Sequence, residues 1–299
     1  MVAGSLPLFG LSSELTMMLI DTHAHLDLPE FAEDLDRVLL RAKQAGVERI
    51  ITIGKTLQSS RRAIELAERY PQIYVSVGIH PNSASRERED FLSQLAQMVK
   101  HPKVVTVGET GLDYYRLASK QEESEVSQTA FGAASFTTIE DEIRDEAEIA
   151  GQAAAFEQHL ELAVATGKSV VIHQRDSWED TIQLLRKYSP RVRAVMHGFD
   201  AGSEQAQEVV DLGCFVSFSG IVTLENAGEV REAAKSVPID RIMVESDSPY
   251  FAPTPNRNKR CEPAFVRETA AFIANLRGMS LAAFAARTTR NAQGFFALS

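Results

Sequence analysis

His23 and His25 lie two positions apart in the motif Asp21-Thr22-His23-Ala24-His25. Alternate residues of an extended chain face the same way, so both imidazoles can point to one side of a strand. Imidazole is a common protein ligand of zinc and related divalent metals. The spacing therefore predicts that these two histidines share one cation.

Residues of the same chemical kind recur after four other strand-like runs: Glu109, His173, His197 and Asp247. In a parallel barrel the C-terminal ends of the strands converge on one mouth, where active sites are built. Taken singly, each residue is also compatible with a hydrogen-bonded histidine or a capping carboxylate. The recurrence of the pattern favours a shared metal site.

Imidazole and carboxylate without thiolate suit Zn, Mn, Co or Fe, and suit Mg only if fewer histidines are engaged. Six ligands exceed the four of a tetrahedral ion. We therefore expect two divalent ions, drawn from Mg, Mn or Zn, with Glu109 as the bridging carboxylate. Such a pair can generate hydroxide at neutral pH and stabilise the attacking and leaving oxygens, so we place the bridging Glu109 at the catalytic centre.

Other polar residues near the same mouth indicate an anionic substrate. His80 follows a strand-like run at 73–77, and Arg175 lies two residues after His173, where a guanidinium can clamp an anion. A basic run at 256–260 follows the last expected strand and supplies three cations: Arg257, Lys259 and Arg260. A charge run of this kind is also typical of a solvated turn, but beside a metal site it predicts phosphate binding.

Short β-branched runs alternate with amphipathic segments of helical length. We expect strands at 18–21, 49–53, 73–77, 103–107, 169–172, 194–196, 214–217 and 241–245. Helices are expected at 36–45, 61–70, 91–99, 152–165, 178–187 and 204–212. This alternation predicts an α/β fold, a single-domain (β/α)8 TIM barrel over residues 18–299, with an open doubly wound sheet as the alternative.

The segment 118–150 interrupts this rhythm, because it is acidic and poor in large apolar residues. It carries −7 of the formal net charge of −10, which leaves the rest of the chain near neutral. We interpret it as an acidic insertion after the fourth strand, either a solvated, partly disordered loop or a lid beside the active site. Residues 1–17 are expected to be an N-terminal extension outside the barrel.

The chain has 299 residues, of which 44% are hydrophobic. No apolar run reaches the roughly 18 residues of a membrane span, and residues 1–18 carry no Lys or Arg, which disfavours a secretory signal. Cys214 and Cys261 do not form a metal-binding pair or a disulfide framework. We expect a cytoplasmic monomer without a membrane partner.

These motifs together resemble the TatD family of metal-dependent deoxyribonucleases, within the amidohydrolase-like barrels. The resemblance extends from about Leu19 to Phe295, interrupted at 118–150. The motifs that carry it are DTHAHLD (21–27), GIHP (78–81), GETGLDYYR (108–116), IHQRD (172–176), HGF (197–199), ESDSPYFAP (245–253) and NRNKRCEPAFV (256–266). Asn258, Cys261 and Ser246 depart from the usual family pattern.

The resemblance implies metal ligation by His23, His25, Glu109, His173, His197 and Asp247. It implies hydrolysis of DNA phosphodiesters as a 3′→5′ exonuclease that prefers single strands, in DNA repair or degradation. It also implies phosphate contacts from His80 and Arg175, with Asp247 orienting or deprotonating the attacking water.

Two other functions remain open from the sequence. One is an amidohydrolase-type reaction on a cyclic amide, lactone or ester; many such enzymes use a carbamylated lysine where this chain has Glu109. The other is a non-catalytic binding scaffold on a barrel, which the presence of all six ligand-type residues disfavours.

Overall fold

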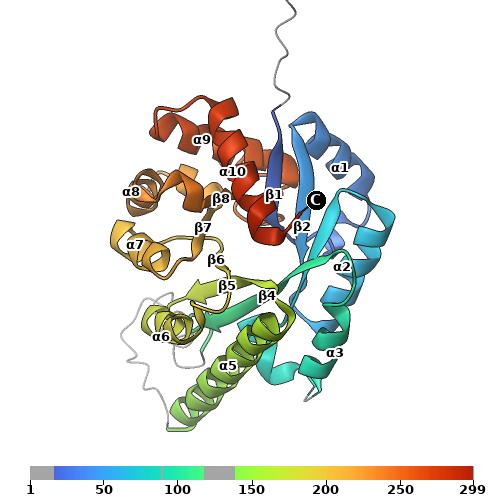
Figure 1. Ribbon diagram of the computed structural model, residues 1–299, viewed down its shortest axis with the longest axis vertical. Coiled ribbons are helices and arrows are strands. Elements are labelled where there is room, and N and C mark those ends of the chain that lie inside the picture. The colour runs from blue at the N-terminus through green and yellow to red at the C-terminus, as the bar shows by residue number, and fades with distance from the viewer. Residues whose placement is uncertain (1–16, 89, 118–138, 299) are drawn as a thin grey trace, which may run out of the picture.

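The computed structural model describes residues 17–88, 90–117 and 139–298 (Figure 1). Eight parallel strands form one sheet in chain order. They are β1 (Leu19–Ala24), β2 (Val47–Ile53), β3 (Ile73–Val77), β4 (Val104–Asp113), β5 (Ser169–Arg175), β6 (Ala194–Met196), β7 (Phe215–Phe218) and β8 (Ile242–Val244). Beyond β8 the chain returns to β1, where Ala24 bridges Ser248 and the Asp247 N–H donates to the His23 carbonyl at 2.9 Å. The sheet is a nearly closed barrel, which confirms the predicted fold over the open-sheet alternative.

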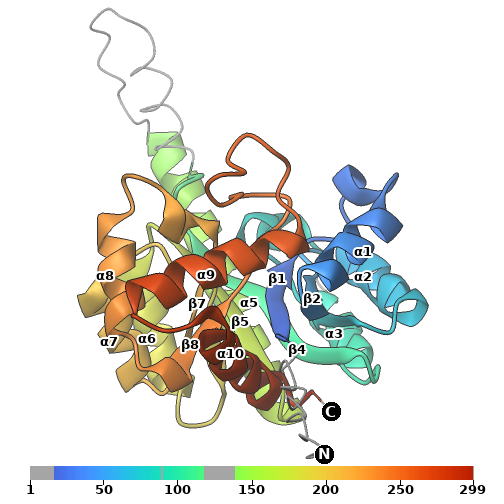
Figure 2. The same ribbon diagram turned by 90° about the horizontal axis from the view of Figure 1, so that it is seen from above.

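Helices cover the outside of the strands (Figures 1 and 2). They are α1 (Leu35–Gln44), α2 (Leu57–Arg69), α3 (Phe91–Met98), α5 (Ile139–Thr166), α6 (Trp178–Tyr188), α7 (Ser203–Asp211), α8 (Gly228–Ser236), α9 (Val266–Leu276) and α10 (Leu281–Phe296). None of these is by itself long and apolar enough to cross a membrane; α9 with the turn before it and α10 meet the test only as a pair bent by 112°.

Two apolar clusters divide the core. The larger lies between the strands and the surrounding helices. The smaller lies inside the barrel, where Ile20, Ile51 and Met243 pack against Phe295 and Phe296 of α10. Helix α10 therefore fills one end of the barrel with aromatic side chains and leaves the other end for polar residues.

Several boundaries differ from those expected. Strand β4 continues to Asp113 instead of ending at residue 107, because it stays paired with β5 through Gly111 and His173. Helices α8 to α10 lie in a region where we predicted no helix. Helices α9 and α10 pack on each other, so each is buried on more than one face. This burial weakens the one-sided apolar periodicity by which a surface helix is predicted.

The acidic segment divides at the start of α5. Residues 139–150 form the first turns of this helix, which begins at Ile139 instead of residue 152, while residues 118–138 lie outside the described part of the chain. Asp145 within these turns is buried. The expected extension 1–17 also lies outside the described residues, apart from Met17.

Gly111 allows β4 and β5 to approach each other closely beside the mouth. Its φ is +142°, which L side chains rarely adopt, and a Cβ there would lie 2.0 Å from the His173 carbonyl oxygen. Backbone on both sides of this contact belongs to the sheet, so a clash cannot be relieved by rotating a side chain.

Gly111→Ala is therefore expected to lower the free energy of unfolding by about 2–4 kcal/mol, from backbone strain and overpacking. Urea unfolding followed by circular dichroism measures the change. The control is Gly151→Ala in α5, where a Cβ meets nothing within 4 Å, and helix propensity predicts a gain of up to about 1 kcal/mol. Equal stability of the two variants would contradict the packing described.

Candidate metal centre

The two histidines of the first motif share one side of β1 at the barrel mouth. His23 lies in the strand and His25 directly follows it; both are buried, and their Nε2 atoms are 3.2 Å apart. Asp247, after β8, places its Oδ1 atom 3.7 Å from the Nε2 atom of His23 and 3.5 Å from that of His25. These three side chains form one group of donor atoms.

Glu109 lies between this group and a second one. Its Oε2 atom is 3.7 Å from the Nε2 atom of His23 and 3.9 Å from that of His25. Its Oε1 atom is 2.9 Å from the Nδ1 atom of His173 and 2.8 Å from the Nε2 atom of His197. All six residues named from the sequence thus meet at one point, with one oxygen of Glu109 toward each group.

The donor set fits divalent metal ions. Among the described residues, three groups of side chains could hold a metal ion, and within each group the ligand atoms lie within 4.8 Å of one another. The groups are His23, His25 and Asp247; His80, Glu109 and His173; and His23, His197 and Glu245. The Oε2 atom of Glu109 is buried without a hydrogen-bond partner among the described residues. A cation would satisfy this oxygen, which otherwise costs free energy in the interior.

The electrostatics of the cluster point the same way. Burial acts against ionisation of Glu109, yet charge on His197 and hydrogen bonds from His173 and His197 hold the pKa of its carboxyl well below its usual value. Burial also acts against protonated His197, but Glu109 raises the pKa of that imidazole well above its usual value. Protons on His173 and His197, whose pKa values are both raised, therefore balance the buried negative charge, and metal binding releases such protons.

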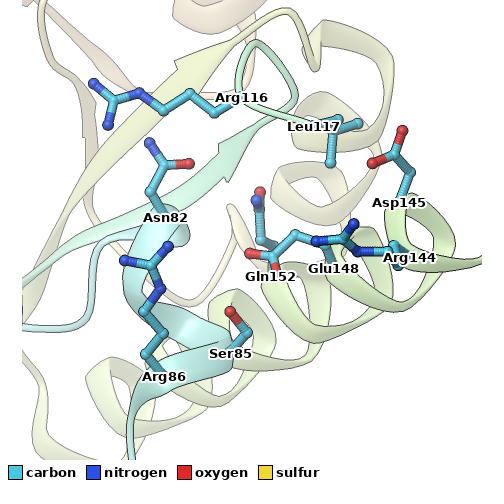
Figure 3. Close-up of a pocket in the computed structure, with 9 residues that line it drawn as sticks. All are labelled: Asn82, Ser85, Arg86, Arg116, Leu117, Arg144, Asp145, Glu148 and Gln152. Atoms are coloured by element: carbon cyan, nitrogen blue, oxygen red, sulfur yellow. The ribbon is translucent and has the colours of Figure 1, made fainter. Parts of the chain in front are cut away.

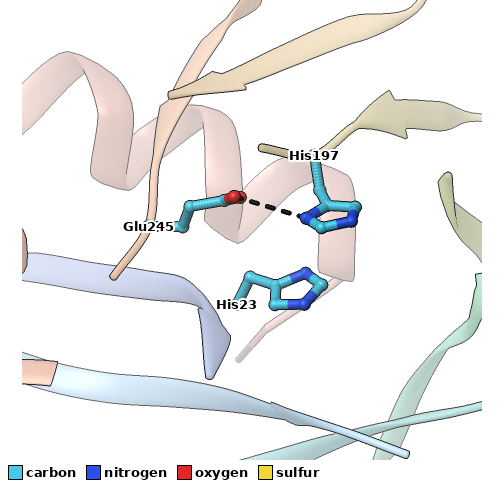
Figure 4. A group of neighbouring side chains, drawn as sticks. All are labelled: His23, His197 and Glu245. Atoms are coloured by element: carbon cyan, nitrogen blue, oxygen red, sulfur yellow. Dashed lines mark ion pairs between the residues drawn. The ribbon is translucent and has the colours of Figure 1, made fainter. Parts of the chain in front are cut away.

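Further polar residues orient the histidines from behind. Asp113 Oδ2 lies 3.2 Å from the Nε2 atom of His173 and accepts a hydrogen bond from the Asn82 side chain at 2.9 Å. Glu245 Oε1 lies 3.4 Å from the Nδ1 atom of His197 (Figure 4). Partners of this kind set the tautomer and direction of metal-binding histidines.

Glu245 is itself held firmly. Its Oε1 atom accepts the Gly198 N–H at 2.6 Å, and its Oε2 atom accepts a hydrogen bond from the Ser217 hydroxyl. Sequence reasoning assigned no role to Asp113 or Glu245, although each lies within a motif already singled out. Both could have been identified from one feature of the sequence, which is a carboxylate that lies at the end of a strand and two or more residues from a predicted metal ligand.

Asp21 connects the two ends of the barrel sheet beneath the metal centre. Its carboxyl accepts the Ser246 N–H at 2.8 Å and the Ser246 hydroxyl at 2.6 Å. Burial raises the pKa of Asp21 to about 8. Ser246, one of the departures from the family pattern, therefore keeps a hydroxyl that links β1 to the chain after β8.

The residues expected to contact substrate separate into two sets. His80 Nε2 lies 3.5 Å from the Oε1 atom of Glu109, so His80 reaches the centre itself. Arg175 ends β5 and is exposed, with its guanidinium carbon 3.5 Å from the centroid of the Tyr115 ring. Both therefore lie at the mouth.

The three cations of the basic run at 256–260 lie apart from the metal centre. Arg260 pairs with Asp34 at 2.9 Å and lies over the Phe31 ring. Lys259 donates to the Asn256 side chain at 2.9 Å, and Arg257 is exposed. Within the described part of the chain, the structure records no contact from these three cations to the metal centre.

A cavity of about 360 Å³ opens between the end of β4, the turn η2 (Pro81–Arg86) and α5 (Figure 3). It is lined by Asn82, Ser85, Arg86, Arg116, Leu117, Arg144, Asp145, Glu148 and Gln152. Asn82 joins its wall to the metal centre through Asp113.

The barrel and this donor set define a metal-dependent hydrolase. The chain belongs to the TatD family: the family described as "TatD related DNase" matches residues 20–297. It is 34% identical to the "Uncharacterized metal-dependent hydrolase YabD" of Bacillus subtilis, covering 94% of this chain and 100% of that protein.

Two further proteins extend the comparison. The "3'-5' ssDNA/RNA exonuclease TatD" of Escherichia fergusonii is 30% identical, covering 94% of this chain and 100% of that protein. The crystal structure of YjjV, a TatD homologue from Escherichia coli, superposes with a TM-score of 0.80 at 27% identity, covering 95% of this chain and 100% of that one.

Replacing Glu245 by Gln removes the charge behind His197 but keeps the size of the side chain. We expect Glu245→Gln to weaken metal affinity by about 10- to 100-fold, as for other residues that orient metal ligands. Chelator competition measures the affinity. Glu232→Gln on α8, where the glutamate side chain is 63% exposed, is the matched control and should leave it unchanged. A loss of folding stability with unaltered metal affinity would assign Glu245 a structural role only.

Proposed function

We propose that this protein hydrolyses phosphodiester bonds of DNA, as a 3′→5′ exodeoxyribonuclease that prefers single strands. The observation that carries the proposal is the buried Glu109 carboxylate, with one group of donors on each of its oxygens. In this proposal the site would take two divalent ions, drawn from Mg, Mn or Zn. His23, His25 and Asp247 would hold one, His173 and His197 would hold the other, and Glu109 would contribute an oxygen to each.

Bound divalent cations supply positive charge that lowers the pKa of water and offsets charge on phosphoryl oxygens. The chain supplies the proton acceptor. Asp247 presents its Oδ1 atom beside His23 and His25, and its main chain is fixed by the hydrogen bond to the His23 carbonyl. We assign Asp247 to orient the attacking water and accept its proton.

His80 and Arg175 are assigned to the phosphate. Burial lowers the pKa of His80 to about 3, so its imidazole is neutral at physiological pH. The Asn82 N–H donates to the Nδ1 atom of His80 at 3.1 Å, which leaves the proton on Nε2. The Nε2–H group of His80 points toward the metal centre and can donate to a phosphate oxygen. The exposed Arg175 supplies positive charge at the mouth of the barrel.

The names of relatives support the substrate. The family is described as a DNase, and the Escherichia fergusonii relative is named as a single-stranded DNA and RNA exonuclease. Glu109 also occupies the position where many cyclic-amide hydrolases use a carbamylated lysine, which favours phosphodiesters over the amide, lactone or ester alternative.

Activity is expected to require a divalent cation and to disappear in chelator, because the proposed reaction depends on cations held by the cluster to activate water. Purified protein, stripped of metal and then supplied with Mg, Mn or Zn, should be tested on labelled single-stranded DNA, a dinucleotide ester and a cyclic amide. Restored cleavage of the DNA alone supports the proposal. Turnover of the cyclic amide alone, or full DNA cleavage by demetallated protein, contradicts it.

Asp247→Asn and Arg175→Ala should separate chemistry from binding. Loss of a general base costs about 10²–10⁴ in rate, so we expect Asp247→Asn to lower kcat steeply while DNA binding survives. Arg175→Ala should raise KM and reduce the log–log salt slope of binding by about one phosphate contact. Steady-state kinetics and fluorescence anisotropy at several salt concentrations measure both.

Each substitution has a matched control elsewhere in the barrel. Asp240→Asn changes an exposed carboxylate just before β8, at its other end. Arg191→Ala removes an exposed arginine that also lies over a tyrosine ring, Tyr188, at 4.8 Å. Near-normal kcat in Asp247→Asn, or an unchanged salt slope in Arg175→Ala, would refute the corresponding role.

A further inference from the structure

Three large aromatic side chains are exposed at the barrel mouth. Tyr115 is 49% exposed, Tyr250 is 42% exposed and Phe251 is 45% exposed. No other aromatic residue among those described is as exposed; the remaining exposed large apolar residues, Met18, Leu40 and Ile143, are aliphatic. Exposed aromatic rings that gather in the loops of an active site indicate a binding surface. Single exposed apolar residues scattered over a protein surface need no such explanation.

The rings lie on opposite sides of the metal centre. Tyr115 follows β4, and Tyr250 and Phe251 follow β8. In a ring of eight strands in chain order, β4 and β8 are four places apart. The Tyr250 ring lies 5.9 Å from the ring of His25, so the β8 side directly adjoins the donor cluster.

The backbone holds Phe251 outward. Its φ is +47°, an unfavourable conformation for a residue with a Cβ. Its carbonyl oxygen packs so closely on the turn η3 (Gly220–Thr223) that a Cβ on Gly220 would lie 2.0 Å away. Positions of this kind persist where the surrounding structure enforces them, commonly at ligand sites.

A cation accompanies the rings on each side. The Arg175 guanidinium lies 3.5 Å from the Tyr115 ring centroid, and the Lys55 ammonium lies 5.4 Å from that of Tyr250. Aromatic rings with a cation beside them match a nucleic acid strand, whose bases stack on aromatic faces while its phosphates pair with cations.

We propose that Tyr115 on one side, and Tyr250 with Phe251 on the other, are stacking surfaces for the unpaired nucleobases that flank the scissile phosphate. This inference rests on the proposed function and names the feature of the substrate that is read. A base paired in a duplex presents its face only to its neighbours in the stack, so these surfaces select single-stranded ends without reading sequence.

The test compares two 5′-labelled oligothymidylates, one complete and one with abasic tetrahydrofuran residues at its 3′ end. For the complete strand, Tyr115→Ala and Phe251→Ala should each raise KM by about 5- to 150-fold with little change in kcat, as expected for the loss of one stacked base. Tyr115→Phe and Phe251→Tyr should retain the wild-type KM, whereas Phe251→Leu, which keeps apolar volume without a ring face, should not.

The abasic strand completes a thermodynamic cycle. The wild-type protein should show a raised KM on this strand, and Tyr115→Ala or Phe251→Ala should raise it little further, because the stacking partner is already absent. Leu40→Ala is the control, since it removes another exposed apolar side chain, 56% exposed on α1. Thermal melting verifies that each variant is folded.

The outcomes distinguish the two proposals. Cleavage of both strands with equal KM, unaffected by Tyr115→Ala and Phe251→Ala, overturns the stacking surfaces and leaves the nuclease proposal standing. A Phe251→Leu variant with wild-type KM likewise overturns stacking on that side. Absence of cleavage of either strand by the metal-loaded wild-type protein overturns the proposed function and the inference with it.

Discussion

The buried carboxylate of Glu109 is the constraint on which the mouth of this barrel depends. A carboxylate removed from water is costly unless positive charge and hydrogen bonds surround it. Here five imidazoles approach its two oxygens, at 2.8 to 3.9 Å. They lie in or after four different strands, so the charge of one side chain ties together elements that are distant in the chain.

Closure of the barrel serves the same centre. β8 makes no continuous ladder with β1; the two are joined by the bridge from Ala24 to Ser248 and by the buried Asp21 carboxyl on Ser246. These contacts run beside His23 and Asp247. At the opposite end, Phe295 and Phe296 of α10 fill the barrel interior. Apolar packing at one end thus supports a polar cluster at the other, the arrangement common to enzymes on this fold.

Much of this could be predicted from residue type and local spacing. The two-residue interval of His23 and His25, and the recurrence of Glu109, His173, His197 and Asp247 after β-branched runs, lead to a barrel whose strand ends converge. Strand direction and side-chain alternation are local properties, so they survive without knowledge of the fold.

Other features depended on tertiary contacts. Three contacts depend on strand register and side-chain direction between distant segments. They are those of Asp113 with His173, Glu245 with His197, and Arg260 with Asp34. The exposure of Tyr115 and Phe251 could not be predicted from the sequence either, because an aromatic residue normally indicates a position in the core. What the sequence by itself determined was the set of chemical groups and the strands that carry them. Only the tertiary structure decided which groups meet and which face solvent, because those outcomes depend on contacts between residues far apart in the chain.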